Sequence, residues 1–253
     1  MRCSHTPEVA LYGMLLIRRI AGMHPGLQAV AARSRGIYFP AMPYPMELWL
    51  VHPREEACAA FRHRFDGLPD VRVLQARFEA LPPHDCFITA GNGFGLMTAG
   101  IDAAVVAFHG AALVERVQRR IVDEYLGEQP VGTCFLERTG TPGYPFVGHA
   151  PTMRMPGPIG GTDAVYRAAW AALLAVYRHN AEVRRGASAG PEIVTVAMPA
   201  LGTGFGGMEL SEAARQMAAA WRFYLDPPHR LDWDAAIRRH QAIGFDGGER
   251  VVR

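Results

Sequence analysis

The chain contains no lysine, because all 26 of its basic residues are arginine. This absence excludes any mechanism that needs a lysine nucleophile or a lysine Schiff base. The 24 acidic residues bring the formal net charge to only +2. So small a charge argues against a protein that coats nucleic acid, and it leaves room only for a local basic groove.

Cysteine is scarce and scattered. The sequence has no CxxC pair and no Cys/His cluster with the spacing of a metal site. We therefore expect reduced thiols, no metal, no cofactor and a cytoplasmic location. The four cysteines are Cys3, Cys58, Cys86 and Cys134.

Long apolar runs are also missing, so the sequence predicts no segment that spans a bilayer and no membrane partner. Residues 9–17 are apolar, but Arg18 and Arg19 follow at once and no convincing cleavage site lies at the right distance. We read this stretch as something other than a signal peptide.

Three prolines indicate where the folded domain begins. Pro40, Pro43 and Pro45 prevent regular structure just before a strand that Met46 opens. We therefore expect residues 1–45 to be a poorly ordered extension. Residues 46–253 then form one domain with a helical C-terminal tail, which is long enough for a full core.

Strand-like and helix-like stretches alternate along this domain, with one adjacent pair of strands. Such a pattern predicts an α/β protein with a mixed, mostly parallel sheet and helices on both faces, a three-layer α/β/α sandwich. The expected strands are 47–51, 71–74, 86–89, 132–136, 146–149 and 192–198. The expected helices are 55–65, 101–108, 111–126, 164–178, 209–224 and 233–243, with a turn at 139–145 and a polar loop at 181–190.

Two glycine-rich loops each join a buried strand to a helix. The first reads GNGFGLMTAG, residues 91–100, between Thr89 and Ile101, and the second reads GTGFGG, residues 202–207, before the helix at 209–224. Glycines let backbone N–H groups come close to an anion, and a helix N-terminus favours negative charge. Two such loops at the carboxyl ends of neighbouring strands would hold one phosphate-containing ligand.

These loops carry a resemblance to a family. ITAGNGFGLMTAGID, residues 88–102, resembles the first ligand loop of macrodomains, and PALGTGFGG, residues 199–207, resembles their phosphate-binding loop. The resemblance covers about residues 47–224. It implies an α/β/α sandwich that binds ADP-ribose or an ADP-ribosylated macromolecule, and some members of the family hydrolyse ADP-ribosyl bonds. Nucleic acid would enter only as a carrier of the modification.

The resemblance also implies roles for single residues. Asn92 would bind the ribose beside the scissile bond, and Asp102 would orient or activate water; these are the two candidate catalytic residues. The sequence leaves an alternative for each, since Asn92 can also be a turn residue and Asp102 an acid that stabilises a helix N-terminus. The further candidate ligand-binding residues are Phe78, Gly91, Gly93, Gly100, Ile101, Arg154, Gly202, Thr203, Gly204, Phe205, Gly206 and Gly207.

His149 and Arg154 bracket a strand end, so either could reach a phosphate, and Arg154 is preferred because guanidinium pairs bidentately with phosphate. Where macrodomains usually carry an Asp that reads the adenine amino group, this chain has Arg77, which cannot accept that hydrogen bond. The site would then hold adenine by stacking on Phe78 and by backbone contacts, or prefer another nucleotide.

Three functions stay open on the sequence. The first is an ADP-ribose-binding domain that hydrolyses an ADP-ribosyl bond on a protein or a nucleic acid. The second is a non-catalytic reader of ADP-ribose or a related nucleotide. The third is a glycine-rich structural module whose cleft has lost its ligand.

Overall fold

The computed structural model describes residues 45–188 and 190–252. The expected poorly ordered extension, residues 1–45, lies outside this part of the chain except for Pro45. The domain expected from residue 46 onward is the part described below.

Six strands form the central sheet, in the order β2-β1-β6-β3-β5-β4. All neighbouring strands run parallel except β5 and β4, which are antiparallel. The predicted mixed, mostly parallel sheet is therefore confirmed. The strands are β1 Glu47–Val51, β2 Val71–Leu74, β3 Cys86–Thr89, β4 Phe135–Thr141, β5 Tyr144–His149 and β6 Thr195–Pro199.

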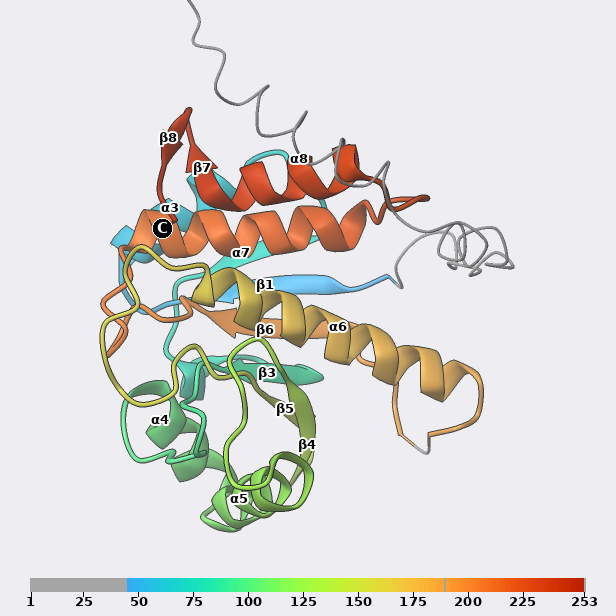
Figure 1. Cartoon of the computed structure of the whole chain (residues 1–253). Helices are drawn as coiled ribbons and strands as arrows, with labels where there is room; N and C mark the ends of the chain where they lie inside the picture. Colours follow the sequence, from blue (N-terminus) through green and yellow to red (C-terminus); the bar gives the residue numbers. More distant parts are fainter. Residues whose placement is uncertain (1–44, 189, 253) are drawn as a thin grey trace, which may run out of the picture. The chain divides into compact units, whose positions relative to one another are not determined.

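Helices cover both faces of this sheet (Figure 1). On one face lie α3 Glu55–Arg64, α6 Ala164–Arg184 and α7 Leu210–Leu225, and on the other lie α4 Gly100–His109 and α5 Ala112–Tyr125. Helix α8, Trp233–Gly244, packs on the outside of α7 (Figure 1). The predicted three-layer α/β/α sandwich is confirmed by this arrangement.

Side chains that point alternately to the two faces of the sheet form two separate hydrophobic cores. In β1, Leu48 and Leu50 join the core under α3, α6 and α7, whereas Trp49 and Val51 join the core under α4 and α5. Successive side chains of a strand point to opposite faces, so a strand buried on both faces must be apolar throughout. This explains the continuous apolar runs from which the central strands were predicted.

The β4–β5 hairpin differs from the prediction. The turn expected at 139–145 is much shorter, because β4 continues to Thr141 and β5 begins at Tyr144. The register shifts between Arg138 and Thr141, and Gly140 there has φ +79°. A bulge that needs a glycine resembles a turn in the sequence, although the strand passes through it.

The C-terminal third holds two further corrections. Helix α6 continues to Arg184, so the first part of the predicted polar loop 181–190 is helical. After α8 the chain forms a small antiparallel hairpin, β7 Phe245–Asp246 and β8 Glu249–Arg250, where only a tail was expected. None of the described helices is both long and apolar enough to cross a membrane.

Candidate functional site

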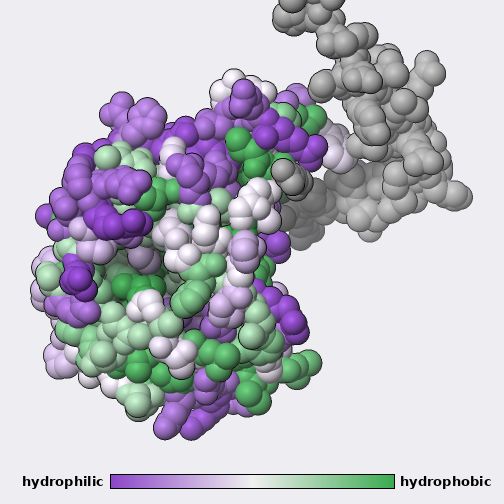
Figure 2. Space-filling view, turned by 90° about the vertical axis from the view of Figure 1, so that its left-hand side faces the viewer, coloured by the Kyte–Doolittle hydropathy of each residue, from purple (hydrophilic) through white to green (hydrophobic). Residues whose placement is uncertain are grey.

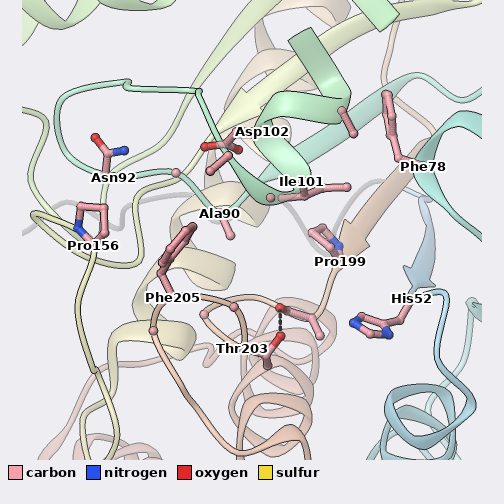
Figure 3. A pocket seen from close by; sticks show the side chains of 18 of the residues that line it. His52, Phe78, Ala90, Asn92, Ile101, Asp102, Pro156, Pro199, Thr203 and Phe205 are labelled. Atoms are coloured by element: carbon pink, nitrogen blue, oxygen red, sulfur yellow. Dashed lines mark hydrogen bonds between the residues drawn. The ribbon is translucent and has the colours of Figure 1, made fainter. Parts of the chain in front are cut away.

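A cavity of about 510 Å³ lies at the carboxyl ends of the parallel strands. The first glycine-rich loop leaves β3 and the second leaves β6, and these two strands are neighbours in the sheet. Asn92 from the first loop and Thr203 from the second therefore line the same cavity (Figure 3). Figure 2 looks onto this end of the molecule, where the surface is hollowed between an apolar and a hydrophilic margin.

Most of the predicted site residues line this cavity. Gly93, Gly207 and Arg154 are the three predicted residues that do not. The predicted residues that do are Phe78, Gly91, Asn92, Gly100, Ile101, Asp102, Gly202, Thr203, Gly204, Phe205 and Gly206.

Gly93 and Gly207 give their N–H groups to the protein. The N–H of Gly93 donates to the carbonyl oxygens of Met153, at 3.0 Å, and Arg154, at 3.1 Å. The N–H of Gly207 donates to Gly204 at 3.0 Å, in a turn where Gly207 has φ +57°. Both glycines thus shape their loops from outside the cavity lining.

Arg154 is engaged in an ion pair. Its Nε and Nη2 atoms lie 2.6 Å and 2.9 Å from the two carboxylate oxygens of Glu128, and its guanidinium lies over the ring of Phe94. This bidentate pair occupies the Nε–Nη2 edge of the guanidinium, an edge that could otherwise pair with a phosphate. The structure therefore gives Arg154 a different partner from the predicted one.

Asn92 holds the first loop in shape. Its side-chain oxygen accepts hydrogen bonds from the N–H groups of Phe94, at 3.0 Å, and Leu96, at 3.3 Å, and its amide donates to the Leu96 carbonyl at 3.2 Å. The residue is only 7 % exposed. Since the amide group has two protons, one of them stays available to a ligand.

Asp102 stands in the first turn of α4 and is 6 % exposed. Its Oδ1 atom is buried without a hydrogen-bond partner among the described residues. Burial penalises the charged form and raises the pKa of this carboxyl to about 7. A carboxyl that lines a cavity with a pKa near neutrality is suited to take up or release a proton.

Free backbone donors lie on both sides of the cavity. In the described part of the chain, the N–H groups of residues 203–206 donate to no protein acceptor. Opposite them, α4 begins at Gly100 after Ala99, which has no side-chain oxygen to cap the helix. The first N–H groups of a helix have no partner within it, and together with the helix dipole they attract an anion.

Phe78 borders the cavity but is 5 % exposed. Its ring packs edge-on against Phe87, with ring centres 4.6 Å apart, and against Phe108, at 5.4 Å. The ring is thus part of the core under α4, and stacking on a base stays a prediction.

His149 lies beneath the first loop, outside the cavity. It is fully buried, and its Nδ1 atom lies 2.6 Å from Oε1 of Gln129. Burial lowers the pKa of this imidazole to about 4, so the ring is neutral at physiological pH. The alternative in which His149 reaches a phosphate is therefore wrong, because the side chain has no access to solvent.

Part of the lining was not predicted from the sequence. Met153, Met155 and Pro156 come from the loop after β5, and His52 follows the end of β1 as Asn92 follows β3. The signal was available, since carboxyl ends of parallel strands meet at one edge of a sheet. Glu79, another lining residue, was also not predicted.

Among the described residues, no group of three or more His, Cys, Asp or Glu side chains could hold a metal ion.

Comparisons with known proteins agree with this arrangement. Residues 88–217, just over half of the chain, match the family model described as Macro domain. An uncharacterized protein of Aeropyrum pernix is 29% identical over 177 residues, which are 65% of this chain and 83% of that protein.

Among solved structures, the Oceanobacillus iheyensis macrodomain with ADP is similar at 21% identity and a TM-score of 0.46, over 56% of this chain and 70% of that one. The Trypanosoma brucei macrodomain in complex with ADP-ribose is similar at 18% identity and a TM-score of 0.42, over 56% of this chain and 52% of that one.

Proposed function

Since this chain belongs to the Macro domain family, we propose that its cavity binds ADP-ribose or a close relative and that the protein hydrolyses an ADP-ribosyl bond on a protein or a nucleic acid. One observation carries the proposal. Within residues 45–188 and 190–252, one cavity has a buried carboxyl at Asp102 whose Oδ1 has no partner, and free backbone N–H groups on two opposite sides.

The diphosphate would lie between these two sets of donors. The N–H groups of residues 203–206 form one side, and the first turn of α4 from Gly100 forms the other. Gly202 and Gly206 make this approach possible, because a side chain at either position would collide with the loop or with Ile159. Backbone donors fixed by the fold bind phosphate oxygens without further ordering, which favours affinity.

The ribose beside the scissile bond would lie between Asn92 and Phe205, at the end of the cavity where Pro156 also lies (Figure 3). Asp102 points into the cavity between this end and Ile101. In the reaction, a water oxygen bonds to the anomeric carbon while the bond to the leaving group breaks. Asp102 takes the proton that the water loses, and the leaving group gains one from solvent.

Turnover and binding can be separated by experiment. We expect ADP-ribose to bind in calorimetry and ADP-ribosylated protein or DNA to be cleaved. Asp102→Ala should lower the hydrolysis rate by about a hundredfold or more while changing the Kd for ADP-ribose much less. Asn92→Ala should impair both, because Asn92 also shapes its loop. Arg119→Ala, on the exposed side of α5, is a control that should change neither.

Activity like that of the wild type in Asp102→Ala would remove Asp102 from the mechanism. Failure of ADP-ribose and of other nucleoside diphosphates to bind at all would overturn the proposal as a whole, and would leave a structural module.

A non-catalytic reader is the second candidate, and the geometry of Asn92 favours it. The side-chain oxygen of Asn92 already accepts two hydrogen bonds from its own loop, so less of this residue is free to orient a substrate. Tight binding of ADP-ribose without cleavage of any ADP-ribosylated substrate would select the reader. In either case we place the protein in the cytoplasm, because the described cysteines Cys58, Cys86 and Cys134 are free thiols.

A further inference from the structure

The end of the cavity at which Asn92 lies opens through an apolar rim. Leu96, Met155, Pro156 and Phe205 all line the cavity, and all four are exposed. The exposed fraction is 45 % for Leu96, 51 % for Met155 and 65 % for Phe205. These four residues are called the apolar rim below.

The rim residues come from three loops but surround the same opening. Leu96 belongs to the first glycine-rich loop, where its N–H donates to Oδ1 of Asn92 at 3.3 Å. Pro156, from the loop after β5, and Phe205, from the loop after β6, lie at the same end of the cavity as Asn92 (Figure 3). Met155 directly precedes Pro156. The rim is therefore one surface that the fold assembles from distant parts of the chain.

Apolar side chains that gather on a surface mark a place where another molecule binds. A single exposed apolar residue has no such meaning, but here three loops bring theirs to the mouth of one cavity. Figure 2 shows apolar surface along one margin of the hollow at this end of the molecule. Under the proposed function the scissile bond lies beside Asn92. The carrier, meaning the molecule to which ADP-ribose is attached, would then lie across the apolar rim.

The charges around the rim disfavour a nucleic acid as carrier. Arg77 is the one arginine among the described residues that line the cavity, and it precedes Phe78, which lies at the opposite end (Figure 3). Arg154 precedes Met155, but its guanidinium is paired with the carboxylate of Glu128. Contacts between cationic side chains and phosphates dominate affinity for nucleic acid, and protein–DNA interfaces are much more positively charged than protein–protein interfaces. The rim lacks this character.

An apolar segment of a protein matches the rim better. The cores of protein–protein interfaces are depleted in charged residues and enriched in aromatic residues and methionine. Methionine is also flexible, so it adapts to apolar partners of different shapes. We propose that the carrier is a protein, and that apolar side chains next to its modified residue contact the apolar rim. This inference rests on the proposed function and specifies its macromolecular substrate.

The test is calorimetric titration of the full chain with three conjugates of ADP-ribose. Each conjugate is joined through a triazole, a linkage that water does not cleave, so binding is measured without turnover. The first is a peptide with leucine on both sides of the modified residue, the second is the same peptide with serine there, and the third is a single-stranded oligonucleotide. The triazole derivative of ADP-ribose without a carrier gives the baseline affinity.

We expect the leucine peptide to bind about tenfold more tightly than the serine peptide, because leucine removes more apolar area from water at the rim. The serine peptide should stay within about threefold of the baseline, because it adds little apolar contact. The oligonucleotide should do the same, because its phosphates find no unpaired guanidinium at the rim.

Variants assign the effect to the rim. Leu96→Ser and Met155→Ser should each reduce the preference for the leucine peptide by about threefold or more and change the baseline affinity less than about twofold. Met155→Arg should raise the affinity for the oligonucleotide, because it adds a guanidinium beside the carrier. Val122→Ser is the matched control. Val122 is 60 % exposed on α5 and does not line the cavity, so its substitution should change none of these affinities.

Equal affinity for the two peptides, or tighter binding of the oligonucleotide than of both peptides, would overturn the inference and leave the proposed function standing. A preference for leucine that survives both Leu96→Ser and Met155→Ser would overturn the role of the rim. Absence of binding for every compound, free ADP-ribose included, would overturn the proposed function as well.

Discussion

A Cβ atom placed on Gly91 would lie 2.4 Å from Nε2 of His149. The backbone of the first loop therefore rests directly on a buried imidazole. The same imidazole contacts Gln129 through Nδ1, and the N–H of Gln129 donates to the carbonyl of Gly93 at 2.8 Å. His149 and Gln129 thus support the loop on both sides of Asn92, although neither lines the cavity.

Gly91→Ala should accordingly displace the first loop. We expect a loss of roughly 1–3 kcal/mol in the free energy of unfolding and weaker ligand binding, because the methyl group has no room against His149. Thermal unfolding and calorimetry measure the two effects. Gly160→Ala is the control, since this glycine does not line the cavity and nothing lies within 4 Å of a Cβ at that position. If the contact with His149 causes the loss of stability, adding His149→Ala to Gly91→Ala should restore part of the free energy of unfolding. Independent effects of the two substitutions would refute this explanation.

Gly206 stands in an equivalent position in the second loop. A Cβ on this residue would lie 2.3 Å from the carbonyl oxygen of Gly202, which is backbone and has little freedom to move. We expect Gly206→Ala to weaken nucleotide binding by about tenfold or more, because it moves the N–H donors of residues 203–206. The same titration on Gly160→Ala, which lies outside the cavity lining, should give affinity like that of the wild type. An unchanged Kd in Gly206→Ala would show that these donors do not hold the diphosphate.

The raised pKa of Asp102 predicts a dependence of stability on pH. The folded-state pKa is about 7 and the ordinary value is 3.8. Between them the unfolded chain has lost a proton that the folded protein still binds, so stability falls as pH rises from about 4 to about 7. Asp102→Asn removes this decrease in stability at rising pH, because the amide does not ionise. We expect it to raise the free energy of unfolding at pH 8 by up to roughly 4 kcal/mol, and to have little effect at pH 4. Denaturant unfolding at both pH values tests this, and equal effects at the two would contradict it.

A buried histidine predicts the opposite dependence. Burial lowers the pKa of His149 to about 4, below the ordinary value of 6.5. Between these values the unfolded chain binds a proton that the folded protein excludes, so stability falls as pH drops from about 6.5 to about 4. His149 contributes up to about 1.4 kcal/mol per pH unit.

The histidine effect is best measured in Asp102→Asn, where the opposing contribution of Asp102 is absent. His149→Asn in that background should flatten the profile by about one proton. A pH profile of stability that is flat between pH 4.5 and 6.5 before this change would count against burial of a neutral imidazole at His149.

Much of the fold could be predicted because its signals are local. Strands 47–51, 71–74 and 86–89 have the predicted bounds, since Pro53, Asp70 and Asp85 interrupt the chain near their ends. Helix α6 was predicted to end at residue 178, but it continues to Arg184. In the folded chain the Asn180 side chain exchanges two 2.8 Å hydrogen bonds with the backbone of Ile193, a partner that the local sequence does not reveal.

The candidate site divides in the same way. The sequence contains a strand, a glycine-rich loop and a helix in this order twice. This pattern determined that two loops leave neighbouring strands and line one cavity. Only the tertiary structure decided where each polar group is directed. Gly93 donates to Met153, Arg154 pairs with Glu128, and Oδ1 of Asp102 is buried without a hydrogen-bond partner among the described residues. Hydrogen bonding and desolvation depend on neighbours that are distant in the chain, and they exist only once the sheet has brought its strand ends together.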